Sequence, residues 1–237
     1  MANTIGELIE RVQSAYSKGV RSDDSRLSNR HIYSKLKTVR NKLISQQLKK
    51  RQKISDWNFV ILPCVELIQV EKHDCPCLPP IGCKVYRTKE KLPKVLTDLD
   101  KHIIQWVMTI ESSKIITETT REAYLYSDGN KYTKKNMNYI LENGYIYVYG
   151  EHVPKLIKIK LLPENPIEAY NFPSYCKQDC TDCEDDCGSM LDKIFPMDGD
   201  MIETLLEMSF PELINIFSQM TEDITNNTSD TNDKNRQ

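Results

Sequence analysis

The chain begins with a pattern typical of an amphipathic helix. Thr4 followed by Glu7 is the signature of a capping box, and the apolar residues after Thr4 recur at the spacing of a single helical face. Gly19 is suited to end this helix, because glycine adopts the left-handed conformation at little cost. The predicted buried face consists of Ile5, Leu8, Ile9 and Val12.

A second, longer helix is predicted from Ser28, a favourable N-cap residue, to about Gln52. Its apolar positions are spaced alternately by four and three residues, which gives a narrow seam for one or two neighbouring helices. We expect this seam to pack against the first helix and against the apolar face of residues 201–220. The seam consists of Ile32, Leu36, Val39 and Leu43.

From Trp57 the chain is rich in β-branched and aromatic residues, which favour strands. The clearest hairpin has its turn at Asn143-Gly144, because these two residues accept the positive φ values of a type I′ turn. Residues 156–162 alternate apolar side chains with lysine, which indicates a strand with one face in water. The other strand candidates are 57–62, 64–70, 84–87, 102–110 and 114–119.

Helical patterning returns near the end of the chain. Asp198 can cap a helix, and Ser209 with Glu212 resembles a second capping box around Pro211, which predicts two short helices or one kinked helix. Residues 223–237 are polar and hold one large apolar residue, so we expect them to become ordered only on a partner.

These elements predict an α+β fold. In it the N- and C-terminal helices form a helical bundle, joined to a β-rich antiparallel middle module and a polar C-terminal arm. The expected divisions are an N-terminal helical region (1–56), the β-rich module (57–175), a cysteine-containing loop with the C-terminal helices (176–222), and the extended arm (223–237).

Composition limits the class of protein. With 39% apolar and 28% charged residues the chain is typical of a globular protein, and no apolar run is long enough to cross a membrane. The N-terminus lacks the features of a secretory signal, so we expect a cytosolic environment. In such a reducing compartment the eight cysteines are expected to be thiols or metal ligands, not disulfides.

Four cysteines lie close together in the sequence, at Cys176, Cys180, Cys183 and Cys187. Four thiolates can hold zinc, but structural zinc sites normally use two separated cysteine pairs, and the acidic residues here disfavour further negative charge. The alternative is a flexible acidic loop with free thiols. No other cofactor is expected.

Charge is distributed unevenly. Residues 26–53 hold ten Lys or Arg and no acid, whereas the charged residues of 179–223 are Asp and Glu with the single exception of Lys193. The basic helix therefore suits either an acidic protein surface or phosphates; the lack of interleaved aromatic residues favours protein. Its candidate partner-binding residues are Arg26, Arg30, Lys35, Arg40 and Lys42.

The sequence gives little indication of catalysis. The four histidines are far apart, and neither a phosphate-binding loop nor a hydrolase motif is present, so we do not expect an enzyme. Three hypotheses follow: an assembly subunit, a nucleic-acid-binding protein that uses residues 26–53, and a cysteine-based zinc module.

Five segments along the chain are informative together: residues 20–27, 63–68, 74–80, 130–133 and 222–230. They resemble a structural-protein family of crAss-like bacteriophages, and the resemblance extends over nearly the whole chain. It implies a virion protein assembled in the host cytoplasm, a head-to-tail connector in the neck. Such subunits often form rings of twelve and combine a helical bundle, a β-rich insertion and a C-terminal extension that docks on the portal.

The resemblance also implies partners. They are other copies of the chain in a ring, the phage portal and the adjacent neck or tail proteins, with a possible contact to packaged DNA and none to a membrane. In the arm, the candidate partner-binding residues are Ile224, Asn226 and Asn227. The family has no catalytic residues to transfer to this chain.

Overall fold

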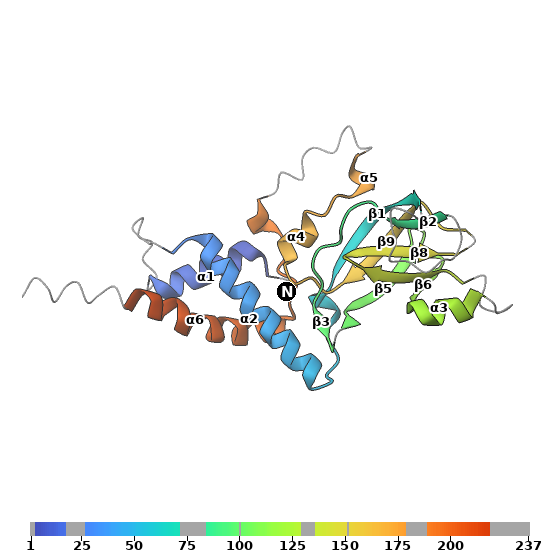
Figure 1. Cartoon of the computed structure of the whole chain (residues 1–237). Helices are drawn as coiled ribbons and strands as arrows, with labels where there is room; N and C mark the ends of the chain where they lie inside the picture. The colour runs from blue at the N-terminus through green and yellow to red at the C-terminus, as the bar shows by residue number, and fades with distance from the viewer. Residues whose placement is uncertain are drawn as a thin grey trace, which may run out of the picture. The chain divides into compact units, whose positions relative to one another are not determined.

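The computed structural model describes residues 3–17, 27–71, 84–99, 101–128, 136–150, 152–178 and 189–218 (Figure 1). The chain divides into two compact units. The first, here the helical unit, combines Met1–Lys50 with Ser189–Gln237, and the second, the barrel unit, is Arg51–Gly188.

The helical unit contains three main helices that contact one another: α1 (Ile5–Tyr16), α2 (Asn29–Lys49) and α6 (Ile202–Ser218). The capping box predicted at the start of α1 is confirmed, because the Thr4 side chain accepts from the Glu7 backbone and the Glu7 side chain accepts from the Thr4 backbone. Ser28 caps α2, as predicted. The predicted apolar faces of both helices are buried, with Leu8, Ile32 and Leu36 completely inaccessible to solvent.

Two short 3-10 turns, η3 (Met190–Asp192) and η4 (Gly199–Met201), precede α6. Between them the chain pairs with the N-terminal segment, because the Ile5 amide donates to the Lys193 carbonyl and the Phe195 amide donates to the Asn3 carbonyl, both at 2.9 Å. These bonds join the two ends of the chain that build the helical unit.

Helix α6 is continuous through Pro211, and the predicted second capping box is wrong. The Ser209 hydroxyl is fully buried and donates instead to the Leu205 carbonyl at 2.7 Å. A serine inside a helix commonly bonds to the carbonyl four residues earlier, so its hydroxyl is satisfied without ending the helix.

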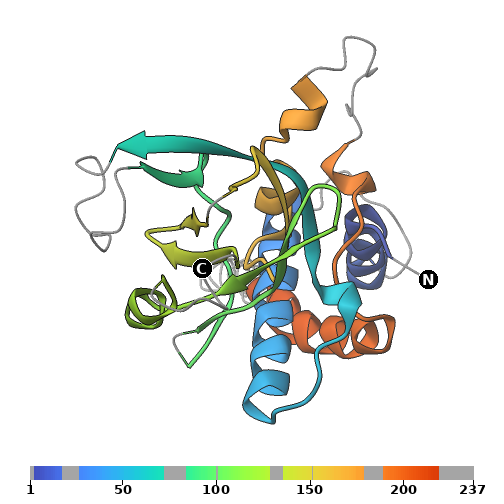
Figure 2. The same cartoon turned by 90° about the vertical axis from the view of Figure 1, so that its right-hand side faces the viewer.

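The barrel unit is built around a closed barrel of seven strands in the order β1-β2-β8-β7-β6-β5-β9. Figure 2 shows β1 as the long curved blue-green strand. The strands are β1 (Val60–Glu71), β2 (Lys84–Thr88), β5 (Ile104–Thr109), β6 (Ile115–Glu118), β7 (Asn138–Glu142), β8 (Tyr145–Tyr149) and β9 (Leu156–Leu161). A separate two-stranded sheet pairs β3 (Thr97–Asp98) with β4 (Lys101–His102). The remaining short elements are η1 (Asp56–Asn58), α3 (Arg121–Asp128), α4 (Pro166–Tyr170) and α5 (Tyr175–Gln178).

The predicted fold class, a helical bundle with a β-rich antiparallel middle module, is wrong. The strands close into a barrel, and one pair, β6 with β7, is parallel, with Thr117 opposite Asn138. A parallel pair requires a crossover connection, which here includes α3. Helix α3 lies outside the barrel wall in both views (Figures 1 and 2). The pattern of apolar residues in the sequence did not predict this helix.

Two local features of the barrel follow from the sequence. Asn143 and Gly144 have φ values of 54° and 82°, which confirms the predicted hairpin turn between β7 and β8. The two strands expected on either side of Pro63 are instead one strand, β1, whose pairing with β9 shifts register between Leu62 and Val65. Proline has no amide proton to donate to the neighbouring strand. It is therefore tolerated inside a strand at such an irregularity, where the regular hydrogen bonding is interrupted.

The barrel interior is filled by inward-facing branched side chains, among which Val107, Ile146, Ile157, Ile159 and Leu161 are inaccessible to solvent. A smaller cluster lies where α3 packs: Tyr124 of α3 and Tyr149 of β8 have ring centroids 4.6 Å apart. Helix α3 thus covers part of the barrel wall. Among the described residues no helix is both long and apolar enough to cross a bilayer.

Candidate functional site

The basic helix α2 presents fewer cations to solvent than its sequence suggests. Of the residues predicted to bind a partner, Arg30 and Lys42 are exposed. The Lys35 side chain is only 15% exposed and forms an ion pair with Glu212 of α6. Arg26 lies outside the described residues.

Arg40 is completely buried, so the expectation that it lies on an exposed basic flank is wrong. Its Nε donates to the Pro196 carbonyl at 2.8 Å and its Nη1 donates to the Asn41 side-chain oxygen at 3.1 Å. A buried guanidinium is tolerated when its donors are bonded. Arg40 therefore fastens α2 to the segment that precedes α6.

The cysteines also differ from the expectation. Cys64 on β1 forms a disulfide with Cys176 in α5, so the prediction of thiols or metal ligands is wrong for this pair. In this state Cys176 has no thiolate to offer a metal. Cys180, Cys183 and Cys187 lie outside the described residues, as do Cys75, Cys77 and Cys83. Within the described part of the chain no group of three or more metal-ligating side chains is assembled.

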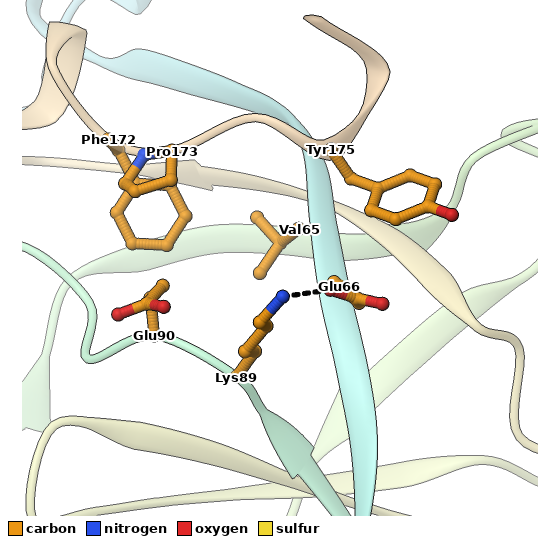
Figure 3. A pocket seen from close by; sticks show the side chains of 7 residues that line it. All are labelled: Val65, Glu66, Lys89, Glu90, Phe172, Pro173 and Tyr175. Atoms are coloured by element: carbon orange, nitrogen blue, oxygen red, sulfur yellow. Dashed lines mark hydrogen bonds and ion pairs between the residues drawn. The ribbon is translucent and has the colours of Figure 1, made fainter. Parts of the chain in front are cut away.

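Next to this disulfide, the segment that includes Tyr175 lies over β1 and encloses a small pocket (Figure 3). Lys89 Nζ lies 3.0 Å from Glu66 Oε2, and this hydrogen bond, with the charge of Glu66, raises the pKa of Lys89. The pocket volume is about 30 Å³, which is space for very few water molecules. This pocket is a packing feature, because it is too small for a ligand.

A larger open groove of about 620 Å³ lies between the β3–β4 hairpin, β6 and α3. Lys101 and Glu118 form an ion pair across it at 3.2 Å. Its other lining residues are His102 and a mixture of apolar and hydroxyl side chains. Leu99, at the hairpin tip, is 94% exposed.

The most distinctive surface feature of the barrel unit is apolar. Trp57, Ile61 and Ile115 are exposed by 66%, 50% and 64%. Ile61 and Ile115 belong to the outer wall formed by β1, β9, β5 and β6. The sequence did not predict this surface, because the strands that carry Ile61 and Ile115 have apolar residues on both faces; the alternating lysines of β9 did indicate that one face of that strand lies in water.

Asp56 holds the turn that carries Trp57. Its Oδ1 accepts from Gln105 Nε2 at 2.9 Å and lies 3.3 Å from Lys160 Nζ, and these hydrogen bonds together with the Lys160 charge lower the pKa of Asp56. The carboxylate thereby joins η1 to β5 and β9, while the neighbouring Trp57 ring remains largely in solvent.

The predicted contacts of the C-terminal arm, Ile224, Asn226 and Asn227, lie outside the described residues. The functional assignment therefore depends on comparison with known proteins. A family model described as phage tail ring protein 2 matches residues 7–234. No curated protein shows significant similarity to the chain.

Proposed function

The chain belongs to the family of phage tail ring protein 2, and we propose that it is a subunit of the neck ring that joins the phage portal to the tail. The observation that supports this most directly is the extent of the family match, which covers residues 7–234 of 237 and therefore both structural units. A phage tail ring protein is a structural component of the virion.

A scaffolding role fits the surfaces of the described residues. The pocket beside Tyr175 is too small for a ligand, and in the open groove beside Leu99 two of the three titratable side chains, Lys101 and Glu118, are paired with each other. Exposed large apolar residues, in contrast, occur on both units, such as Ile115 and Ile194. Exposed apolar patches on a protein that is made to assemble are expected to become contacts. We therefore propose a non-enzymatic role.

We propose that twelve copies form a closed ring that contacts the portal and the next neck or tail protein. A ring repeats every surface charge by symmetry, so the exposed Arg30 and Lys42 would give a much larger field in the assembly than in one chain. This field can meet an acidic protein or packaged DNA. Because Arg40 is buried and Lys35 is paired within the chain, direct DNA binding by α2 of the free subunit has less support.

Quantitative mass spectrometry of purified particles, with labelled peptides as standards, tests this assignment. We expect about twelve copies of the chain per particle and, by cryo-electron microscopy, a ring between portal and tail. Particles that lack the chain would disprove the virion role. A ring located at another position in the tail would disprove the neck assignment alone.

We also propose that residues 223–237 act as a docking arm in the ring, with Ile224 as the apolar anchor and Asn226 and Asn227 as hydrogen-bonding residues. Ordering this polar segment costs about 1–2 kcal/mol per residue in backbone entropy, so many contacts must act together. Deletion of 223–237 is expected to leave thermal stability unchanged and to prevent incorporation into particles. Normal incorporation of the shortened chain would contradict this role.

A further inference from the structure

Strand register places six side chains together on the outer wall of the barrel. Lys160 of β9 lies opposite Ile61 of β1 on one side and Trp106 of β5 on the other. In the next outward-facing row, Met108 of β5 lies opposite Lys158 of β9 and Ile115 of β6. With Trp57, these residues form what we call the outer barrel face.

The residues between these two rows show that the rows lie on the outside of the barrel. Val107 lies between Trp106 and Met108, faces Ile159 and Ile116 across the same strands, and all three are buried in the barrel core. Because side chains alternate along a strand, the two rows point away from the core. Four of their six residues are nevertheless apolar.

The exposure of this face is unusual for an apolar surface. Trp57, Ile61 and Ile115 make up most of the large apolar residues that are well exposed in the described part of the chain, the others being Leu99 and Ile194. The turn that carries Trp57 is held by its neighbour Asp56, whose carboxylate is bonded to Gln105 and Lys160. An exposed tryptophan is typical of residues that dominate the energy of an interface.

We propose that the outer barrel face docks on a second copy of this chain, and that it makes one side of the subunit contact in the ring. This inference depends on the proposed ring function. Identical subunits in a ring meet head to tail, so each must supply two different and complementary faces. The outer barrel face supplies the first, with apolar side chains and the positive charge of Lys158; the charge of Lys160 is paired with Asp56 within the chain.

The complementary face is on the helical unit of the neighbouring copy. There Ile194 is 47% exposed, and the same short segment carries Asp192 and Asp200, both exposed, and the half-buried Asp198. With three aspartates against one lysine, Lys193, this segment has a net negative charge around the apolar Ile194. It therefore matches the outer barrel face in both charge and apolar character. Opposite charges around an apolar contact fix its orientation and register.

Site-specific photocrosslinking in assembled particles tests the contact. A benzophenone amino acid replaces Trp57 in one variant and Ile115 in another, and the matched control replaces Leu99, an exposed apolar residue on the β3–β4 hairpin. We expect positions 57 and 115 to crosslink to a peptide of a second copy that contains residues 192–200, at several times the yield of the control.

Charge reversal gives a second test. Lys158→Glu is expected to reduce ring assembly at least tenfold, and Lys158→Glu combined with Asp200→Lys is expected to restore it, because the pair exchanges the charges of the two faces. Thermal unfolding of both variants confirms that the chain is folded.

The outcomes distinguish this inference from the function on which it depends. Crosslinks from positions 57 and 115 only to other virion proteins or to DNA, or yields equal to those of the Leu99 control, would overturn the contact while the chain remains a ring subunit. Absence of the chain from particles would overturn both. Failure of Asp200→Lys to restore assembly would overturn the assignment of the complementary face.

Discussion

Cys64 and Cys176 are joined by a disulfide although 112 residues separate them in the chain. Cys64 is a buried residue of β1, whereas Cys176 belongs to α5, which follows all seven barrel strands. The bond therefore closes a covalent loop around nearly the whole barrel unit. Closing a long loop lowers the conformational entropy of the unfolded chain, which stabilises the folded state.

Removal of this bond is expected to destabilise the barrel unit. Cys176 is exposed, so Cys176→Ser breaks the bond without creating a cavity. We expect the free energy of unfolding to fall by about 2–4 kcal/mol, measured by urea denaturation under oxidising conditions. A reductant should lower the wild-type value by a similar amount. Equal stability of the oxidised wild type and the variant would contradict the stabilising role of the bond.

Arg40 is expected to stabilise the helical unit. Arg40→Ala removes the donors to Pro196 and Asn41 and leaves a cavity, so we expect a loss of roughly 2–5 kcal/mol in the free energy of unfolding. The matched control is Lys42→Ala, an exposed cation on the same helix, with an expected change within about 0.5 kcal/mol. Similar small effects of both substitutions would show that Arg40 is not a structural residue.

The helices were predictable because their signals are local. Thr4 and Ser28 are followed within three residues by the backbone amides that they cap, and the apolar faces repeat within one or two turns. Such patterns fix where a helix begins and which side is buried. The continuous course of α6 through Pro211 was harder to predict, because a proline that follows a serine is also typical of the start of a new helix.

Barrel closure was not predictable in the same way. Leu161 lies opposite Val60 on one side and opposite Ile104 on the other, and both partners are far away in the sequence. Alternation identifies which side chains of a strand share a face, but it does not identify the neighbouring strands. The parallel pairing of β6 with β7 was missed because Arg121–Asp128 is polar and gives only a weak helical pattern.

The surface residues were the least predictable. Arg40 belongs to a run of cations, and only tertiary packing distinguishes it from Lys42. Ile61 follows Val60, and Ile115 precedes Ile116, so in sequence the exposed and the buried β-branched residues look alike. Strands with apolar residues on both sides resemble strands buried on both faces.

The hairpin turn between β7 and β8 is expected to require glycine at position 144. Gly144 has a φ of 82°, and an added Cβ would lie 2.6 Å from Lys91 Cε. The left-handed conformation costs about 1–2 kcal/mol for a residue with a Cβ, so Gly144→Ala should destabilise the protein by that amount in thermal or urea unfolding. Most of the loss should remain in a Lys91→Ala background, because Lys91 is flexible and the backbone conformation is not.

Gly199→Ala is the control for this substitution. No atom lies within 4 Å of a Cβ at position 199, and the residue lies in the 3-10 turn η4. We expect a neutral effect or a stabilisation of up to about 1 kcal/mol, since alanine restricts the unfolded chain. A Gly144→Ala protein as stable as Gly199→Ala would show that the turn tolerates a side chain.

The last prediction concerns alkaline pH. Burial raises the pKa values of Tyr139 and Tyr149 above the ordinary value of 10.0, and for Tyr149 the nearby Tyr124 and Glu142 add to the effect. Above pH 10 the unfolded chain loses these protons while the folded protein retains them. The contribution of each tyrosine to the free energy of unfolding is therefore complete below pH 10. Above pH 10 it is lost by about 1.4 kcal/mol per pH unit for each tyrosine.

Comparison of wild type with Tyr149→Phe isolates this effect. Within the described residues the Tyr149 hydroxyl has no hydrogen-bond partner, so its removal should cost little at neutral pH. In urea unfolding measured from pH 9 to about pH 11, the variant should lose stability less steeply than wild type, because it keeps one ionisable tyrosine fewer in the core. Lysine deprotonation affects both proteins alike, so the difference between the two slopes belongs to Tyr149. Parallel slopes would show that Tyr149 ionises in the folded protein as readily as in the unfolded chain.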